Sequence, residues 1–303
     1  MEYHGDEGKI VVYELIQVAE STYYIQSPAK IGIVKLNDTD VCLIDSGNDK
    51  DAGKKIKKVL DAQGWNLVAI YNTHSHADHI GGNKYLQSQT GCKIYAAGIE
   101  AHFAKSPVLE PTSLYGGFPS KDLRHKFLMA QESEVEELTS EKLPEGLEII
   151  PLPGHSFDMV GFRTKDDVVF LADSLSSKET LDKYQISFLY DVESYLQTLE
   201  MIKTIRAKKF IPSHAMETDD TTELAQHNID KVNELAEKII EFCEEATTFE
   251  ALLQKLFTEY NLTMTHEQHA LVGSTVRSYL SWLKDSGKLI TNIENNMLLW
   301  QQA

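Results

Sequence analysis

A single short segment, residues 71–82 (YNTHSHADHIGG), concentrates side chains that can bind a metal ion. It places His74, His76, Asp78 and His79 within six consecutive residues. Neutral imidazoles and carboxylates are ligands that zinc, iron and manganese accept in proteins. A solvated loop has no need of three histidines in so short a stretch. The segment is therefore interpreted as a metal-binding motif.

Three metal-capable residues farther along the chain share one context, the end of an apolar run. They are His155 after Leu147–Leu152, Asp173 after Val168–Ala172, and His214 after Phe210–Pro212. A lone histidine or aspartate is weak evidence for a site. Three in the same context, all downstream of the histidine-rich segment, indicate that several strand ends supply one centre.

The elements that must position these side chains follow from periodicity. Leu67–Asn72 reads as a strand, and open α/β sheets place ligand sites at the carboxyl ends of their strands. If the extended backbone continues, His74 and His76 point to the same side. Asp78 and His79 then lie on the turn into a helix predicted over about residues 78–89. The glycines at 81 and 82 let that turn pack closely against neighbouring backbone.

The surrounding pattern predicts an α+β fold, a mixed sheet with helices on its faces. Further strands are expected at Lys9–Ala19, Tyr23–Leu36, Val41–Asp45 and Lys93–Ala97, with a helix at Asp51–Gln63. The three cysteines are too few and too widely spaced for a disulfide framework, which fits a reducing cytoplasm. Cys42 and Cys92 lie in apolar runs and are interpreted as buried small hydrophobic residues.

Two regions depart from this rhythm. Residues 104–146 form an insertion rich in proline and glycine, which is interpreted as a lid or pocket wall. After an amphipathic helix at about 221–245, the chain predicts three short helices and a two-stranded hairpin, with Ser274 capping the third helix. That succession has the outline of a winged helix. We expect a catalytic domain over 1–217 and a C-terminal helical, winged-helix-like domain over 218–303.

From about residue 9 to residue 215 the chain resembles the metallo-β-lactamase-fold superfamily. THSHADH matches its HxHxDH motif, and LIDSG at 43–47 matches its aspartate-bearing turn. The final motif reads PSHA where glyoxalase II-like members carry GHG. The resemblance implies a four-layer αββα sandwich with a binuclear centre between two sheets. Carried over by position, one metal is bound by His74, His76 and His155, the other by Asp78, His79 and His214, and Asp173 bridges the two.

The implied chemistry is hydrolysis by a metal-activated water. Two divalent ions about 3.5–4 Å apart can share a hydroxide and polarise a carbonyl group. Zinc is the expected metal, with iron and manganese as alternatives. Asp78 or Asp173 can carry a proton to the leaving group, and Asp45 is expected to orient a ligand histidine. We expect a small ester, thioester or lactone as substrate. Two alternatives stay open: a mononuclear-iron persulfide dioxygenase, and a phosphodiesterase with nucleic-acid contact through the winged helix.

Candidates for substrate binding come from two places in the sequence. Tyr115, Phe118 and Arg124 lie in the insertion, and Lys183, Tyr184 and Tyr190 follow Asp173. Arg124 and Lys183 each offer a positive charge for a substrate carboxylate.

Net charge and hydropathy limit the classes of partner that the chain can bind. The chain of 303 residues has a net charge of −17, which repels nucleic-acid phosphates and anionic lipid. No run of 18 apolar residues, and no basic segment followed by an apolar one, marks a membrane span or a secretory signal. We therefore expect a cytoplasmic enzyme with a small-molecule substrate and no membrane or nucleic-acid partner. For the C-terminal region we expect either docking on the catalytic domain or a homodimer contact.

Overall fold

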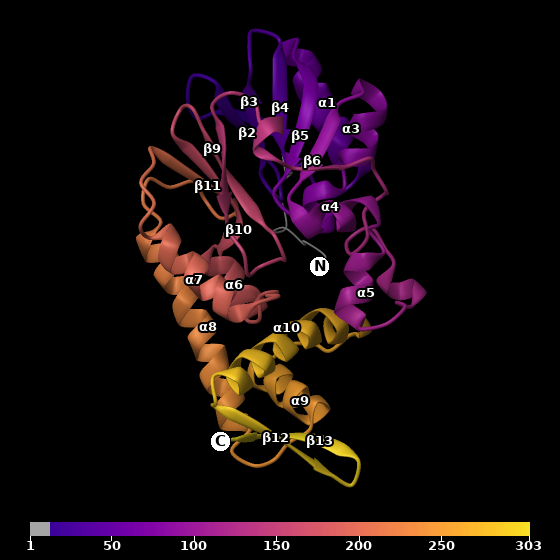
Figure 1. The fold of residues 1–303 in the computed structure, drawn as a ribbon, viewed down its shortest axis with the longest axis vertical. Helices are drawn as coiled ribbons and strands as arrows, with labels where there is room; N and C mark the ends of the chain where they lie inside the picture. Colours follow the sequence, from indigo (N-terminus) through magenta and orange to yellow (C-terminus); the bar gives the residue numbers. More distant parts are fainter. Residues whose placement is uncertain (1–12) are drawn as a thin grey trace.

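The computed structural model describes residues 13–303, and its framework is a pair of facing β-sheets (Figure 1). The larger sheet has the strand order β1-β2-β3-β4-β5-β6-β7. Its strands are β1 (Glu14–Gln17), β2 (Thr22–Gln26), β3 (Ile31–Lys35), β4 (Asp40–Ile44), β5 (Asn66–Asn72), β6 (Lys93–Ala96) and β7 (Glu136–Glu137). The smaller sheet has the order β11-β10-β9-β8. Its strands are β8 (Leu147–Pro151), β9 (Val160–Thr164), β10 (Val168–Ser176) and β11 (Lys209–His214).

Helices cover the outer face of each sheet, which gives four layers. One hydrophobic cluster fills the space between the sheets, where Ile44 and Tyr71 of the larger sheet meet Phe162 of the smaller one. The larger sheet is covered by α1 (Lys50–Gln63), α3 (Asn83–Thr90) and α4 (Gly98–Lys105). The smaller sheet is covered by α7 (Val192–Ile202) and α8 (Thr222–Phe242), with α6 (Lys178–Tyr184) beside them. The expected αββα sandwich is confirmed.

Local sequence signals account for most element boundaries. The side chain of Asp49 accepts hydrogen bonds from the backbone N–H groups of Asp51 and Ala52, so α1 begins at Lys50. It ends at Gly64, whose left-handed φ of 68° suits glycine. The single helix expected over 78–89 is wrong. The chain forms α2 (Ala77–Ile80) and then α3, because the glycines at 81 and 82 separate them.

Several strands differ from the predictions. Of the predicted strand Lys9–Ala19, residues 9–12 lie outside the described residues and the rest forms β1 over Glu14–Gln17. The run Tyr23–Leu36 forms two antiparallel strands, β2 and β3, because the chain turns at residues 27–30. Strand β9 was not predicted. Asp173 lies inside β10 rather than after it, since this strand continues to Ser176. Its pairing with β11 shifts register on both sides of Ala172, which has a φ of 49°. That irregularity turns the strand where Asp173 must face the centre.

The insertion at 104–146 packs against the C-terminal part of the chain. It contains α5 (Leu109–Tyr115), two 3-10 turns, η1 (Lys121–Leu123) and η2 (Ser140–Lys142), and β7. Leu114, Leu123 and Leu128 form a small hydrophobic cluster with Ala270 of α10 (His266–Asp285). In Figure 1, α10 accordingly runs beneath α5. The insertion and α10 therefore pack together as one unit.

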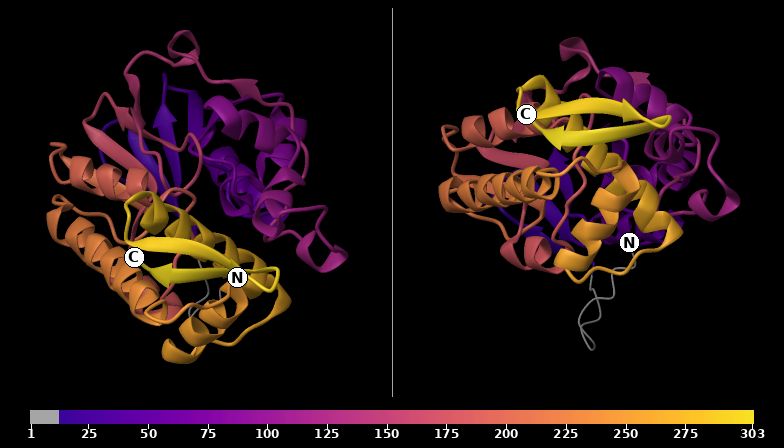
Figure 2. Two further views of the ribbon diagram at one scale, coloured as in Figure 1. Left: turned by 60° about the horizontal axis from the view of Figure 1, so that its bottom comes forward. Right: turned by 90° about the horizontal axis from the view of Figure 1, so that it is seen from below.

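The C-terminal region has two helices where three short ones were predicted. After α9 (Phe249–Glu259), α10 continues from His266 to Asp285 without a break. Ser274 does not cap a helix, because its hydroxyl donates to the Leu271 carbonyl within α10 (3.0 Å). Strands β12 (Leu289–Glu294) and β13 (Met297–Gln302) pair antiparallel, and the hairpin lies across α9 and α10 (Figure 2).

The largest hydrophobic cluster is continuous from the smaller sheet to the C-terminal helices. It runs from Leu171 of β10 through Leu235 of α8 to Leu280 of α10. The division at residue 217 stays a prediction. Cys42, Cys92 and Cys243 are free thiols, as their spacing predicted. All three are buried, which was predicted for Cys42 and Cys92. Across residues 13–303, every helix is too short or too polar to cross a bilayer.

Candidate metal centre

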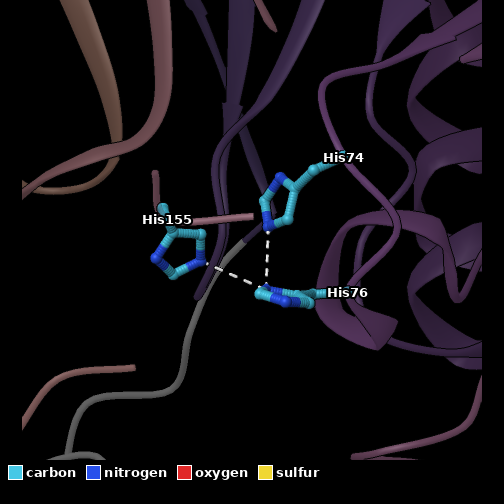
Figure 3. A group of neighbouring side chains, drawn as sticks. All are labelled: His74, His76 and His155. Carbon is cyan, nitrogen blue, oxygen red and sulfur yellow. Dashed lines mark hydrogen bonds between the residues drawn. The ribbon is translucent and has the colours of Figure 1, made fainter. Parts of the chain in front are cut away.

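Three histidines from two distant segments meet at the first half of the centre. His74 and His76 follow β5, and His155 follows β8. The Nδ1 atom of His76 lies 3.1 Å from His74 Nε2 and 3.1 Å from His155 Nε2 (Figure 3). The three residues can each offer a ligand atom within 4.8 Å of the others. We call His74, His76 and His155 the histidine group.

Four residues form the second half, which we call the mixed group: Asp78, His79, Asp173 and His214. His214 Nε2 lies 3.3 Å from Asp78 Oδ2 and 3.2 Å from Asp173 Oδ2. His79 Nε2 lies 3.2 Å from Asp173 Oδ1. The structure thus brings together all seven residues that the sequence placed in one centre.

Asp173 touches both groups. Its Oδ2 atom is 3.5 Å from Nε2 of His155 and 3.9 Å from Nε2 of His74, while both its oxygens contact the mixed group. A carboxylate in this position can bridge two cations.

The centre lies at the carboxyl ends of strands from both sheets. His74 and His76 leave β5, and His155 follows β8 through a turn at Gly154 with a φ of 119°. A Cβ atom on Gly154 would lie 2.2 Å from the backbone nitrogen of Tyr195, so only glycine fits this turn. A Cβ atom on Gly82 would lie 2.2 Å from the Ser46 carbonyl oxygen. The absence of a side chain at Gly82 therefore lets the turn after α2 lie close to the loop after β4.

The histidine group is electrically neutral near pH 7. Burial lowers the pKa of His76 to about 4 and that of His155 to about 3, although Asp173 opposes both shifts. Burial, together with the neighbouring imidazoles of His79 and His76, also holds the pKa of His74 well below its usual value. Neutral imidazoles are the form that binds a metal.

In the mixed group the histidine pKa shifts in the opposite direction. Burial alone would lower the pKa of His79, but the carboxylates of Asp173, Asp78 and Asp45 outweigh it and hold that pKa well above its usual value. Burial opposes ionisation of Asp78 and Asp173, yet His79 and His214 keep the pKa of each carboxyl group below its usual range. The two carboxylates of the mixed group make it an environment suited to a cation.

Two buried atoms of the mixed group also fit a metal. Within residues 13–303, His79 Nε2 and Asp173 Oδ1 lie 3.2 Å from each other, but neither makes a hydrogen bond of good geometry. Buried polar atoms are rarely left without a partner. Both atoms point into the cluster, so a divalent cation there would satisfy them.

Asp45 holds two parts of the centre in place. It is buried, and its Oδ2 lies 2.8 Å from His79 Nδ1. The same carboxylate accepts hydrogen bonds from the backbone N–H (2.8 Å) and the hydroxyl (2.7 Å) of Thr73. Thr73 in turn lies 3.0 Å from His74 Nδ1 through its hydroxyl. One carboxylate thereby orients a histidine of the mixed group directly and one of the histidine group through Thr73.

Glu100, which sequence reasoning missed, ties the two loops of the histidine group together. It is completely buried in α4. One oxygen accepts from the backbone N–H and hydroxyl of Ser75, and the other accepts from the hydroxyl of Ser156 (2.6 Å) and the backbone N–H of Asp158 (3.1 Å). Ser75 lies between His74 and His76, and Ser156 follows His155. A carboxylate among the apolar residues of a helix was the available signal.

Two neighbouring cavities open at the centre. The first, of about 180 Å³, is lined by the metal-capable residues and by apolar side chains such as Phe127, Leu128 and Leu271. The second, of about 430 Å³, shares His76, Glu110, Leu114 and Phe188 with the first and extends to α10. Burial, with help from Asp78 and Glu100, raises the pKa of Glu110 well above its usual value.

The predicted substrate residues divide between the cavities and the surface. Tyr184 lines the first cavity, and Tyr115 and Tyr190 line the second. Phe118, Arg124 and Lys183 line neither of the two and are exposed. The guanidinium of Arg124 lies over the Phe118 ring, and the Lys183 ammonium lies over the ring of Tyr184.

Comparison with known proteins places this architecture in a family. The family model described as "Metallo-beta-lactamase superfamily" matches residues 26–214. A beta-lactamase domain protein from Burkholderia ambifaria superposes with a TM-score of 0.72 at 14% identity, covering 98% of this chain and 96% of that one. A metallo-beta-lactamase family protein from Thermus thermophilus gives a TM-score of 0.71 at 15% identity, covering 93% of this chain and 99% of that one.

Curated relatives match over shorter stretches. A hydroxyacylglutathione hydrolase of Methylococcus capsulatus is 45% identical over 47 residues, which is 16% of this chain and 18% of that protein. One from Cereibacter sphaeroides (strain ATCC 17023) is 30% identical over 121 residues, which is 40% of this chain and 38% of that protein. The matched segments thus span less than half of these relatives. The family match covers well over half of the present chain, which therefore belongs to the metallo-beta-lactamase superfamily.

Proposed function

We propose that this protein is a metal-dependent hydrolase that attacks a small ester, thioester or lactone with an activated water molecule. The observation that carries the proposal is the position of Asp173, whose carboxylate contacts both the histidine group and the mixed group. Six potential ligands around one bridging carboxylate suit a pair of divalent ions.

In this proposal, His74, His76 and His155 hold one ion, Asp78, His79 and His214 hold the other, and Asp173 bridges them. Ions held there would lower the pKa of a bound water toward neutrality and polarise the scissile carbonyl group. Asp45 fixes the ring of His79 through the hydrogen bond at Nδ1, so Nε2 faces the cluster. Zinc is the proposed metal.

Asp78 is the proposed proton carrier. Its side chain is 38% exposed, against 10% for Asp173, and it lines the first cavity. This position lets the carboxylate reach a substrate in the cavity, where we propose that it accepts a proton from the attacking water and passes it to the leaving group. Asp173 is more enclosed and contacts more imidazoles, which favours a purely structural and electrostatic role.

The substrate class follows from the relatives and the cavity. The curated relatives are hydroxyacylglutathione hydrolases, whose name denotes hydrolysis of an acyl compound. The first cavity is small and largely apolar beyond the metal-capable residues, as a short acyl group requires. We propose a small-molecule substrate, with no nucleic-acid or membrane partner, for a cytoplasmic enzyme whose C-terminal domain begins near residue 218 and supplies a homodimer contact.

Elemental analysis of the purified protein, paired with a panel of thioesters, lactones, phosphodiesters and glutathione persulfide, tests the proposal. We expect two zinc or manganese ions per chain and turnover of an acyl compound. One iron per chain with oxygen consumption on persulfide would instead establish a dioxygenase. Turnover of phosphodiesters alone would establish the phosphodiesterase alternative.

A further inference from the structure

The second cavity leads away from the metal centre and ends at the C-terminal helix α10. Its inner end includes His76 and Ser75, and its outer end includes Arg277, Ser274 and Ser278 of α10. The lining between is mixed. It includes the rings of Phe103, Phe157 and Phe188 and the polar side chains of Glu110, Ser113 and Ser156. A substrate bound at the metals can thus extend an arm along this passage toward α10.

Arg277 is an exposed cation at the end of this passage, and among residues 13–303 no carboxylate lies within ion-pair distance of it, although Glu250 acts on it electrostatically from farther away. Across residues 13–303, only Lys126 and Arg277 bring a lysine or arginine side chain to either cavity, and Lys126 is paired with Asp49 (2.9 Å). Arg277 makes no hydrogen bond and no ion pair with any of the described residues. The carboxylate of Glu250 is instead bonded to His269 (2.9 Å). Although the chain has a net charge of −17, no acidic side chain in the part that the structure describes pairs with this arginine, so its charge is available to an anionic ligand.

The guanidinium is also held in position. It lies over the ring of Phe249 in α9, with Cζ 3.8 Å from the ring centroid. Stacking on an aromatic face orients the planar group and leaves its edge donors available. Two tyrosines of the same cavity, Tyr115 and Tyr190, are each 48% exposed, and their hydroxyl groups make no hydrogen bond within the described residues.

We propose that Arg277 is the anchor of an anion subsite that binds a carboxylate or phosphate at the far end of the substrate, with Tyr115 and Tyr190 as additional donors. The substrate class narrows to acyl compounds whose leaving group carries an apolar arm with an anionic end. A guanidinium fork matches two oxygens of either anion, whereas a neutral arm offers it no charge to bind. This inference rests on the proposed function for the identity of the scissile bond.

The first test compares butanoyl thioesters of three thiols: mercaptohexanoate, mercaptohexyl phosphate and the neutral mercaptohexanamide, with shorter and longer arms alongside. For the wild-type protein we expect a KM about tenfold to a hundredfold lower for an anionic thioester than for the neutral one, as a charge-assisted hydrogen bond provides. Arg277→Ala should remove this difference by raising KM, with kcat unchanged. Arg277→Lys should retain part of it, because the charge remains without the fork.

Arg206→Ala is the matched control, since Arg206 is an exposed arginine that lines neither cavity and bonds only to backbone carbonyls. It should leave both the KM values and the preference for an anionic arm unchanged. An equal KM for charged and neutral arms in the wild-type protein would overturn the subsite. So would an Arg277→Ala protein that keeps the preference. The better of the carboxylate and phosphate arms identifies the natural anion.

A second measurement separates the subsite from the hydrolytic function. Thioether analogues of the same three compounds cannot be hydrolysed, and their binding is measured by calorimetry. We expect tighter binding of the anionic analogues by the wild-type and Arg206→Ala proteins, and equal binding of all three by Arg277→Ala. If the analogues behave so while no thioester is turned over, the subsite stands and the proposed hydrolysis fails. Equal binding of the three by the wild-type protein overturns the subsite whatever the turnover.

Discussion

The carboxylate of Glu100 accepts hydrogen bonds from both the backbone N–H (2.9 Å) and the hydroxyl group (2.5 Å) of Ser75, the residue between His74 and His76. Its other oxygen holds the loop that follows His155. A buried side chain outside the ligand set thereby sets the distance between the two loops of the histidine group. Residues in such positions influence a metal site through the ligands they orient.

Glu100→Gln should weaken metal binding without unfolding the protein. Glutamine has one acceptor oxygen, so it cannot accept from both loops, and one set of serine and backbone donors loses its partner. We expect a loss of about tenfold to a hundredfold in zinc affinity, measured by competition with a chromophoric chelator. Glu136→Gln, which removes an exposed carboxylate paired with Lys93 and Lys142, serves as the control. Equal affinities for the two variants would show that Glu100 does not position the histidines.

Asp45→Ala should impair the mixed group more than the histidine group. The substitution removes the acceptor for His79 Nδ1, and the His79 ring then loses its fixed orientation. We expect hydrolytic activity to fall by about tenfold to a hundredfold, and one of two bound metals to be lost first on dialysis. Elemental analysis during dialysis checks this. Loss of both ions at one rate would contradict the distinct roles assigned to the two groups.

Metal binding should release a proton at the mixed group and none at the histidine group. In the metal-free protein the pKa of His79 is raised well above its usual value, so its imidazole is charged at pH 7 and must lose a proton to bind a metal. Affinity there rises with pH up to that pKa. His76 and His155 stay neutral until the pH falls to about 4 and about 3.

Calorimetric titrations with zinc in buffers of different ionisation enthalpy measure this proton release. Of two binding steps, one should depend on the buffer and the other should not. The buffer-dependent step should disappear in a His79→Ala protein. Two steps with the same buffer dependence would show that the charges of the two groups do not differ in the metal-free protein.

His76→Ala should abolish turnover and leave the fold intact. His76 lies after the end of β5 and contacts the other imidazoles of the histidine group, so little of the core depends on it. We expect activity to fall by more than about a hundredfold. The thermal midpoint of the metal-free variant should match that of the metal-free wild type. Unfolding of the variant would show that the histidine is structural.

The sequence predicted the seven clustered residues because each follows a local rule. Apolar runs that precede His155 and His214 mark strands, and the carboxyl ends of neighbouring strands meet at one edge of a sheet. The spacing of His74, His76, Asp78 and His79 likewise depends only on a strand leading into a short helix. These relationships hold within a few residues, so periodicity and composition reveal them.

Helix continuity and substrate residues were harder to predict, because long-range packing decides them. Gly273 and Ser274 read as a break between helices, but in the structure α10 packs against Phe249 and Leu253 of α9, close enough that a Cβ atom on Gly273 would contact both side chains. Arg124 and Lys183 were chosen for their charge and their neighbours in the sequence. Neither side chain reaches a cavity.

The sequence by itself determined which side chains can hold metals and the strand ends that carry them. Only the tertiary structure decided that Glu100 joins the loops of His74 and His155, that the insertion and α10 share one wall, and that Arg277 meets the passage from the metal centre. Each of these contacts joins segments more than 20 residues apart, which no local periodicity encodes. They arise because the burial of apolar faces packs whole elements together. Polar groups buried in that packing are stabilised only where they form hydrogen bonds or ion pairs with groups on the neighbouring element.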